Sequence, residues 1–482
     1  MRIQSLVLAA LSAGLGQAAP ASIAKTPAPA TEILPQRAIP DNNYLTSTAS
    51  ANLASGLHFH RPHNVHERES SFPLQLSNNL TSGSLRAYIS GRDYNDALVF
   101  VTSQGALYAP QSQKKAPDMD ALDDGTIGIE LSQSESKNIS IPGELTSARV
   151  YFAQDASLQF FALLLRNGTA RLVTPTTANA NDASNETRWG FAEFTFKEGE
   201  AKDAGLTVNP SYVDFAPPFT IDVSATDEES GKSYTTKGLP KDGLEKICQE
   251  LNSQADKDGM PWDKLCITDK QGNIIRVLSP NIYRSRTHDP EAFDNYFEPY
   301  ITAAWQHFAS SQKSLNFDTQ FQGLQNVSCH LASADGEFQC DNNGNTIPKP
   351  TTADIFSCST GPFTNAGTDE HKNIVARLCA AFVRSTILPP SNIFTLNTAS
   401  SDAADADIYA LQPSSNLPAS SYYKNDICNH YARILHEVLP EGKGYAFSYD
   451  DVNPSETKGV VGGGADGTIK ISKPAGMAVV VS

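Results

Sequence analysis

Short strands separated by turns fill residues 71 to about 224 and limit the folds this chain can adopt. Aromatic and β-branched residues dominate these runs, and helical periodicity is nearly absent. Several short strands at regular spacing are typical of a β-sandwich or β-barrel. The main runs are LRAYISG, ALVFVTSQGALYAP, ARVYFAQ, LQFFALLL, ARLVTP, GFAEFTF and FTIDVSA.

The pattern changes near residue 236, where apolar residues begin to recur at helical spacing. LPKDGLEKICQELN predicts one helix, and HKNIVARLCAAFVRSTIL and ICNHYARILHEVL predict two more. DPEAFDNYFEPYITAAWQHF carries an apolar stripe from Phe293 to Phe308, which Pro299 should kink or split into two helices. The segments GYAFSYDD and GTIKISKP return to strand character, and we expect them to rejoin the first domain.

The N-terminal segment has the features of a secretory signal peptide. Arg2 precedes an apolar run that is too short for a membrane span, and the small residues around Ala18 and Ala19 suit cleavage. The predicted organisation is a signal peptide over 1–18, a Pro/Ala/Ser/Thr-rich leader or propeptide over 19–70, a first β-barrel part over 71–228, a helix-rich α/β domain over 229–439, and closing barrel strands over 440–482.

Sequons and cysteines agree with a secreted glycoprotein that is extracellular or in the cell wall. Sequons begin at residues 79, 138, 167, 185 and 326. Secretion permits disulfides, and closeness in sequence suggests the pairs Cys248–Cys266 and Cys329–Cys340. Because the chain has 7 cysteines, at least one is unpaired or bonded to another chain.

Charge and motifs exclude several classes of function. The net charge is −16 without a basic block, so we do not expect nucleic acid as a partner. Beyond the N-terminus no apolar segment is long enough to span a membrane, so we expect no membrane partner, and we expect a monomer. No cofactor or metal is predicted. Four histidines between His58 and His66 could in principle hold a metal, but a solvated polar segment is the preferred interpretation. Nucleophile-elbow, zinc-protease and phosphate-loop motifs are absent from the sequence.

A carboxylate within an aromatic strand is the most informative candidate for chemistry. In RWGFAEFTF, alternation places Glu193 on one face with Trp189, Phe191 and Thr195. Downstream, the alternation of PSYVDF predicts Asp214 on a second strand. Two strand carboxylates facing one groove would suit glycoside hydrolysis. Spacing alone favours the plainer interpretation, that both carboxylates lie on solvated faces.

A series of segments along the chain resembles a known family. The segments ARVYFA, LQFFALLL, RWGFAEFTF, LTVNPSYVDFAPPFTIDV, ITAAWQHF, DIFSC, ARLCAAFVRST, NHYARILHEVL and GYAFSYDDV, in this order, are similar to glycoside hydrolase family 64, the thaumatin-like β-1,3-glucanases. The resemblance covers about residue 73 to the C-terminus. It implies a mainly β fold, with a thaumatin-like β-barrel or sandwich beside a smaller mixed α/β domain, and a wide groove for β-1,3-glucan between them.

The resemblance also implies roles for individual residues. Glu193 matches the general acid and Asp214 the general base of an inverting hydrolysis, with Thr195, Ser211 and Trp189 as candidates for substrate binding. Two features depart from the expected pattern: the loop KEGEAKDAG between the carboxylates is long, and two prolines closely follow Asp214.

Rival interpretations remain open at this stage. Asp450 and Asp451 are alternative carboxylates, for which a turn or strand end is preferred over a role in lining the groove. The chain could also be a glucan-binding thaumatin-like protein without turnover, or a structural wall glycoprotein. The presence of both carboxylates of the family motif favours an enzyme over these two alternatives.

Overall fold

The computed structural model describes residues 71–482 except 116–117, 167, 169, 200–203, 288–290, 312–313, 320–323, 325–326, 342–344, 365, 389–418 and 453–465. The predicted signal peptide, the leader and the histidines of residues 58–66 lie outside the described residues. The described part is mainly β, as the sequence predicts. Within it, no helix combines the length and apolar character needed to cross a membrane.

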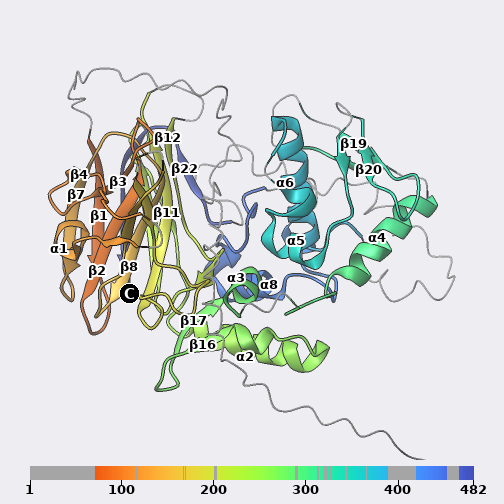
Figure 1. Cartoon of the computed structure of the whole chain (residues 1–482), viewed down its shortest axis with the longest axis horizontal. Coiled ribbons are helices and arrows are strands. Elements are labelled where there is room, and N and C mark those ends of the chain that lie inside the picture. Colours follow the sequence, from red (N-terminus) through yellow and green to blue (C-terminus); the bar gives the residue numbers. More distant parts are fainter. Residues whose placement is uncertain are drawn as a thin grey trace, which may run out of the picture. The chain divides into compact units, whose positions relative to one another are not determined.

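Two large sheets form the β region (Figure 1). The order of the five-stranded sheet is β15 (Ser233–Thr236), β14 (Ile221–Asp227), β23 (Pro474–Val481), β1 (Ser71–Asn78) and β7 (Ser136–Pro142). The order of the eight-stranded sheet is β22 (Ile469–Ile471), β12 (Gly205–Pro210), β11 (Arg188–Lys197), β8 (Leu145–Gln154), β2 (Leu85–Arg92), β3 (Leu98–Val101) and β4 (Leu107–Tyr108), with β6 (Ile129–Leu131) also paired to β2.

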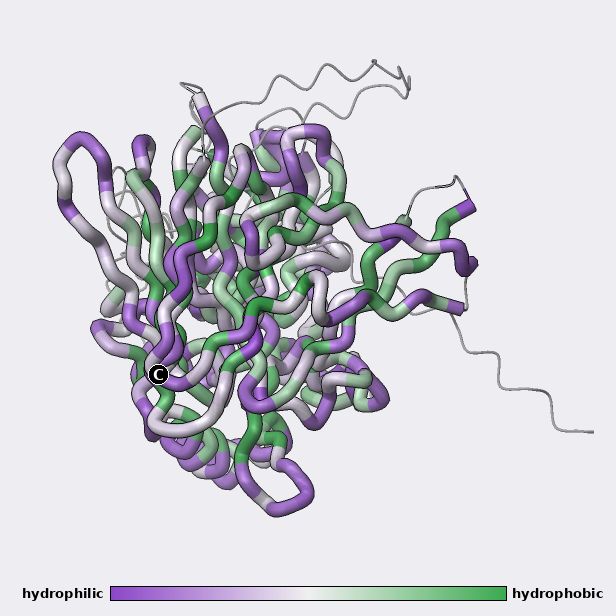
Figure 2. Tube along the Cα trace, turned by 90° about the vertical axis from the view of Figure 1, so that its left-hand side faces the viewer, coloured by the Kyte–Doolittle hydropathy of each residue, from purple (hydrophilic) through white to green (hydrophobic). Residues whose placement is uncertain are grey.

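The inner faces of the two sheets share one apolar core. It joins residues such as Leu74 of β1 and Val479 of β23 to Val150 of β8 and Phe194 of β11, all of them buried. Figure 2 shows hydrophobic and hydrophilic segments alternating along the chain, with hydrophilic residues at many of the outer turns. Burying one face of each strand in this way fixes the register of the sheets, because a slip by one residue would expose the apolar set.

A second, aromatic cluster covers the outer face of the eight-stranded sheet. Tyr151, Trp189 and Phe191 belong to it, together with Phe160 and Phe215. Beside it lie the small sheet of β10 (Ala170–Val173), β9 (Phe161–Leu164) and β5 (Asp120–Ala121), and the short helix α1 (Asp124–Ile127). The cluster therefore occupies the face on which Glu193 was predicted to lie.

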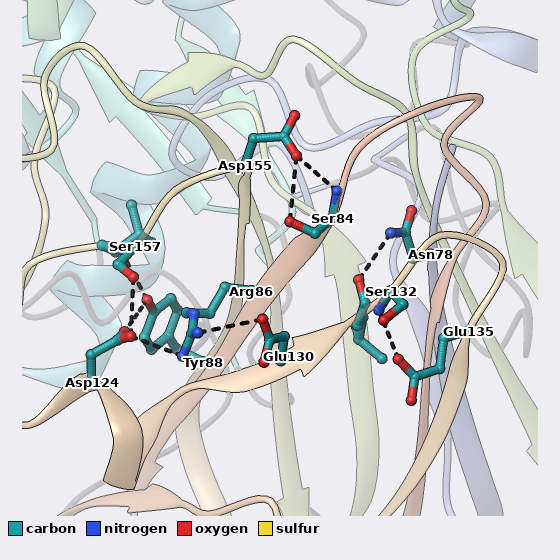
Figure 3. Close-up of polar contacts among 12 residues, drawn as sticks. Asn78, Ser84, Arg86, Tyr88, Asp124, Glu130, Ser132, Glu135, Asp155 and Ser157 are labelled. Carbon is teal, nitrogen blue, oxygen red and sulfur yellow. Dashed lines mark hydrogen bonds and ion pairs between the residues drawn. The ribbon is translucent and has the colours of Figure 1, made fainter.

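A polar network fastens α1 to strand β2, as Figure 3 shows. Asp124 accepts hydrogen bonds from the hydroxyls of Tyr88 at 2.6 Å and Ser157 at 3.0 Å. Arg86 completes the network through an ion pair with Asp124 at 2.8 Å. These groups satisfy one another, so we assign them a structural role.

The segment between the strands is helix-rich and has its own core. Its helices are α2 (Gly243–Asp258), α3 (Pro280–Thr287), α4 (Glu298–Ser311), α5 (Thr352–Ser357), α6 (Asp369–Val383) and α8 (His430–Val438), with 3-10 turns at Trp262–Leu265, Gly361–Phe363, Ala419–Ser421 and Pro440–Gly442. Its strands are β13 (Phe215–Ala216), β16 (Cys266–Thr268) and β17 (Ile274–Leu278) in one sheet, and β18 (Leu315–Phe317), β19 (Val327–His330), β20 (Phe338–Cys340) and β21 (Thr346–Ile347) in another.

Three disulfides stabilise this helix-rich segment. The predicted pairs Cys248–Cys266 and Cys329–Cys340 are confirmed, and a third pair joins Cys358 of the α5 end to Cys379 of α6. The remaining cysteine, Cys428, is buried and free. The apolar positions predicted for α2, namely Leu244, Ile247 and Leu251, are buried as expected.

The predictions for the segment around Pro299 and for GYAFSYDD are wrong. The helix expected across Pro299 begins only at Glu298, so Pro299 lies in its first turn, where the missing N–H costs nothing. Residues 291–297 form turns, in which Phe293 and Asn295 have positive φ. The segment GYAFSYDD is a turn and not a strand, apart from an isolated bridge between Tyr445 and Ser211.

The C-terminal strands pair with the first part of the chain. β22 lies antiparallel to β12, and β23 lies between β1, to which it is parallel, and β14. The helix-rich segment is connected to the β region by pairing of β13 with β17 and by a hydrogen bond from the Tyr431 hydroxyl to the Tyr212 carbonyl at 2.6 Å. The proposed domain limits remain predictions.

Candidate active site

A row of polar residues crosses four neighbouring strands of the eight-stranded sheet. The register pairs Ser90 of β2 with Arg149 of β8, Arg149 with Glu193 of β11, and Glu193 with Asn209 of β12. Directly opposed residues project from the same face of a sheet. The row therefore lies on the outer face, which Phe191 shares.

Glu193 forms an ion pair with Arg149. The Nε atom of Arg149 donates a hydrogen bond to Oε1 of Glu193 at 2.9 Å, and its Nη2 atom lies 2.8 Å from the same oxygen. Only 7% of the Glu193 side chain is exposed, so the guanidinium compensates a charge that would otherwise be costly to bury. The Arg149 guanidinium also lies 4.4 Å from the centre of the Phe191 ring, in a cation–π contact.

Asp214 approaches the same guanidinium from a different element. It was predicted on a strand, but it lies in the bend between β12 and β13. Its backbone carbonyl accepts a hydrogen bond from the Ser279 amide at 3.0 Å, and Pro217 and Pro218 follow the two residues of β13. The prolines end β13 after two residues. The bend before β13 takes Asp214 out of the strand alternation that the sequence predicts.

The two carboxylates meet at one atom of Arg149. Its Nη2 lies 2.8 Å from Oε1 of Glu193 and 3.9 Å from Oδ2 of Asp214. The separation of these two oxygens is therefore no larger than the sum of the two distances. Burial raises the pKa of Asp214; Arg149 acts against this shift and the Glu193 carboxylate adds to it. Burial alone would lower the pKa of Arg149, but the Glu193 carboxylate above all reverses this and raises it.

The other neighbour of Glu193 is an amide. Asn209 is fully buried, and among the described residues neither its Nδ2 nor its Oδ1 has a hydrogen-bond partner. Glu193 thus has a cation on one adjacent strand and an unpartnered amide on the other.

The candidate substrate-binding residues occupy different environments. Thr195 follows Glu193 on the same face, is half-buried, and accepts a hydrogen bond from the Ser147 amide at 3.2 Å. Ser211 is buried and lies at the bridge to Tyr445. Trp189 is only 2% exposed and packs in the aromatic cluster, so the structure places it in the core and not on a sugar-binding surface.

Asp450 and Asp451 lie in a turn, which was the preferred interpretation. Asp450 is buried and forms ion pairs with Arg384 at 2.9 Å and His436 at 3.1 Å. Asp451 accepts a hydrogen bond from the Tyr445 hydroxyl at 2.8 Å. Asp450 is therefore a structural carboxylate that stabilises the turn.

A small hollow lies beside the backbone segment that carries Asp214. It is lined by Val213, which precedes Asp214, by the start of α3, by the N-cap of α8 and by the turn after Tyr445; the lining residues are Val213, Ser279, Pro280, Asn281, Phe356, Asn429, Ala446, Phe447 and Ser448. Residues from the β region and from the helix-rich segment thus meet beside Asp214.

Sequence reasoning found both carboxylates but missed Arg149 and Asn209. Arg149 lies 44 positions before Glu193, and nothing in the sequence indicates that their strands pair. Asn209 could have been found, since β11 and β12 form a hairpin and pairing outward from its loop sets Asn209 opposite Glu193.

Comparison with known proteins identifies the family. Residues 70–481 match the model of glycoside hydrolase family 64, described as β-1,3-glucanase, and the chain belongs to this family. Proteins of an Arthrobacter species and of Cellulosimicrobium cellulans, each named glucan endo-1,3-β-glucosidase, are 24% identical to the chain over 395 and 400 residues. These alignments cover 80% of the chain and 62% of each relative, so the chain spans less than two thirds of their length.

Solved structures share the fold. A laminaripentaose-producing β-1,3-glucanase in complex with laminaritetraose superposes with a TM-score of 0.66 at 22% identity, covering 85% of this chain and 98% of that one. A β-1,3-glucanase domain from Clostridium beijerinckii gives a TM-score of 0.60 at 20% identity, with the same coverage.

Proposed function

We propose that this chain is a secreted β-1,3-glucanase that hydrolyses its substrate by an inverting acid/base mechanism. The observation that carries the proposal is the approach of Glu193 and Asp214 to one guanidinium atom, in a chain that matches the family 64 model over residues 70–481. A pair of carboxylates is the machinery that most glycoside hydrolases use. The signal peptide and sequons support secretion, and the family resemblance supports a thaumatin-like barrel with a wide glucan groove.

In the proposed reaction, Glu193 protonates the glycosidic oxygen while Asp214 removes a proton from the attacking water. Burial raises the pKa of Asp214, which makes its carboxylate a stronger base. Arg149 lies between the two groups and holds Oε1 of Glu193, so the oxygen that transfers the proton is Oε2. The charge of Arg149 also lets the two carboxylates approach each other without full repulsion.

Substitution of the carboxylates tests the proposal. The changes Glu193→Gln and Asp214→Asn are nearly isosteric, and each should lower turnover of laminarin by several orders of magnitude, measured by release of reducing sugar. Glu130→Gln on β6 and Asp256→Asn on α2, both exposed positions, serve as controls and should retain activity. Retained activity in either site variant would remove that residue from the mechanism, and an inactive wild-type chain that still binds laminarin would indicate the glucan-binding alternative.

The same variants separate the two roles. A substrate with a good leaving group, such as a dinitrophenyl laminari-oligosaccharide, needs little help from a general acid. Glu193→Gln should therefore cleave this substrate far better than it cleaves laminarin, whereas Asp214→Asn should be inactive on both. The opposite pattern would reverse the assignment of acid and base.

A further inference from the structure

Asn209 differs from the other buried asparagines of the described residues. Asn78 makes three hydrogen bonds, Asn425 donates two, and Asn429 caps helix α8. Asn209 has no partner among the described residues although it is fully buried. A buried polar group without a partner costs about 1–3 kcal/mol, and an apolar residue at this position would avoid that cost.

The position of Asn209 indicates which group it serves. Its Cα pairs directly with that of Glu193 across β11 and β12. Opposed side chains have Cβ atoms only ~4.5–5.5 Å apart, so one water molecule can bridge the amide to the Glu193 carboxyl, with which it makes no direct hydrogen bond in the structure. Arg149 occupies Oε1 of Glu193 from the opposite side. Oε2 is thus the oxygen available to Asn209.

An amide suits both proton states of a general acid. Its Nδ2 donates to a carboxylate, and its Oδ1 accepts from the hydroxyl of a carboxylic acid. A general acid passes through both states in every catalytic cycle. Neither an apolar residue nor a second carboxylate could serve both states, because the first forms no hydrogen bond and the second adds a like charge.

We propose that Asn209 is a positioning residue that holds Oε2 of Glu193 in the orientation for proton transfer to the glycosidic oxygen. This inference rests on the proposed glucanase function and names a residue of the same site. The charged or titratable groups that face Glu193 are Arg149 and Tyr151 of β8 and Asp214, and none of them is expected to replace the amide.

The variant Asn209→Leu tests the inference. It is expected to lower kcat on laminarin roughly 10- to 100-fold with little change in KM, because the acid is present but misoriented. On the dinitrophenyl substrate, which needs no acid, turnover should stay near the wild-type rate. The melting temperature should be unchanged or higher, because an unpartnered polar group has been removed.

The control is Asn78→Ala in β1, whose side chain makes three hydrogen bonds and lies outside the carboxylate site; Figure 3 shows this side chain. This variant should lower the melting temperature and leave both activities unchanged.

Should Asn209→Leu fail to fold, Asn209→Asp keeps the shape of the side chain and should lose activity on laminarin more than on the activated substrate. Wild-type kcat on laminarin in either folded variant, or an equal loss on both substrates, would overturn the inference. An inactive wild-type chain would overturn the glucanase function itself, so the two failures are distinguishable.

Discussion

At the residue scale, the central feature is a carboxylate on an aromatic face. Sequence alternation correctly set Glu193 beside Phe191, but the compensating charge comes from another strand. Arg149 neutralises the carboxylate through a hydrogen bond and an ion pair to the same oxygen, and it lies against the Phe191 ring. Strand register, which depends on the whole sheet, brings this cation to Glu193, and for that reason local sequence could not reveal it.

Asp214 is expected to lower stability at neutral pH. Because burial raises its pKa in the native state, the folded chain binds this proton more tightly than the unfolded chain does. Stability is therefore greatest below the unfolded pKa of ~3.9 and falls as the pH rises through the native pKa. The inactive variant Asp214→Asn should thus melt a few degrees above the wild type at pH 7, and the difference should disappear below about pH 4.

Thermal melting over a pH series measures this effect, with Asp256→Asn as the control that should follow the wild type at every pH. A lower melting temperature for Asp214→Asn at pH 7 would show that attraction to Arg149 outweighs burial at Asp214.

At the scale of elements, the β11–β12 hairpin was predictable and the segments around it were not. Aromatic and β-branched residues identify both strands. The bend at Asp214 and the turn after Tyr445 resemble strands in composition, yet tertiary contacts decide their structure. Tyr212 donates its amide to the Tyr445 carbonyl at 2.8 Å, which connects the end of β12 to that turn.

Buried ion pairs hold this turn in place. Asp450 accepts hydrogen bonds from Arg384 at 2.9 Å and from the Ala446 amide at 2.9 Å, and it faces His436. Burial would raise the pKa of Asp450, but His436 and Arg384 together hold it below its usual value. Removing one partner would leave the buried cations uncompensated.

We therefore expect Asp450→Asn to reduce the free energy of unfolding by about 3–5 kcal/mol, measured by urea denaturation. Turnover of laminarin should also fall, because the turn contacts the segment that leads to Asp214. Asp256→Asn provides the exposed comparison. A stability loss no larger than that of the control would show that Asp450 does not anchor the turn.

At the scale of the whole molecule, the class of fold and the order of its segments could be predicted from sequence. Period-two patterns gave the strands, and helical spacing gave α2, α6 and α8. Two disulfides followed from closeness in sequence, whereas Cys358–Cys379 requires the packing of α5 against α6. The return of the C-terminal segment to the first domain was predicted, but its strand partners were not: β23 pairs with β1, at the opposite end of the described chain.

The separation of the carboxylates also depends on the whole fold. In inverting glycosidases the two carboxyl groups stand ~6.5–9.5 Å apart. The contacts of Arg149 restrict the nearest oxygens to the short end of this range or below it. Because the separation of the two carboxylates lies near the lower limit for inversion, the stereochemistry of the reaction is the most sensitive test of the proposed mechanism.

Proton NMR of the products formed in the first moments of laminarin hydrolysis, before mutarotation, measures that stereochemistry directly. Cleavage of a β-linked glucan with inversion should give the α-anomer first, in the wild type and in the active control Glu130→Gln. Appearance of the β-anomer first would contradict the acid/base account, because it would mean that one of the two carboxylates attacks the sugar directly.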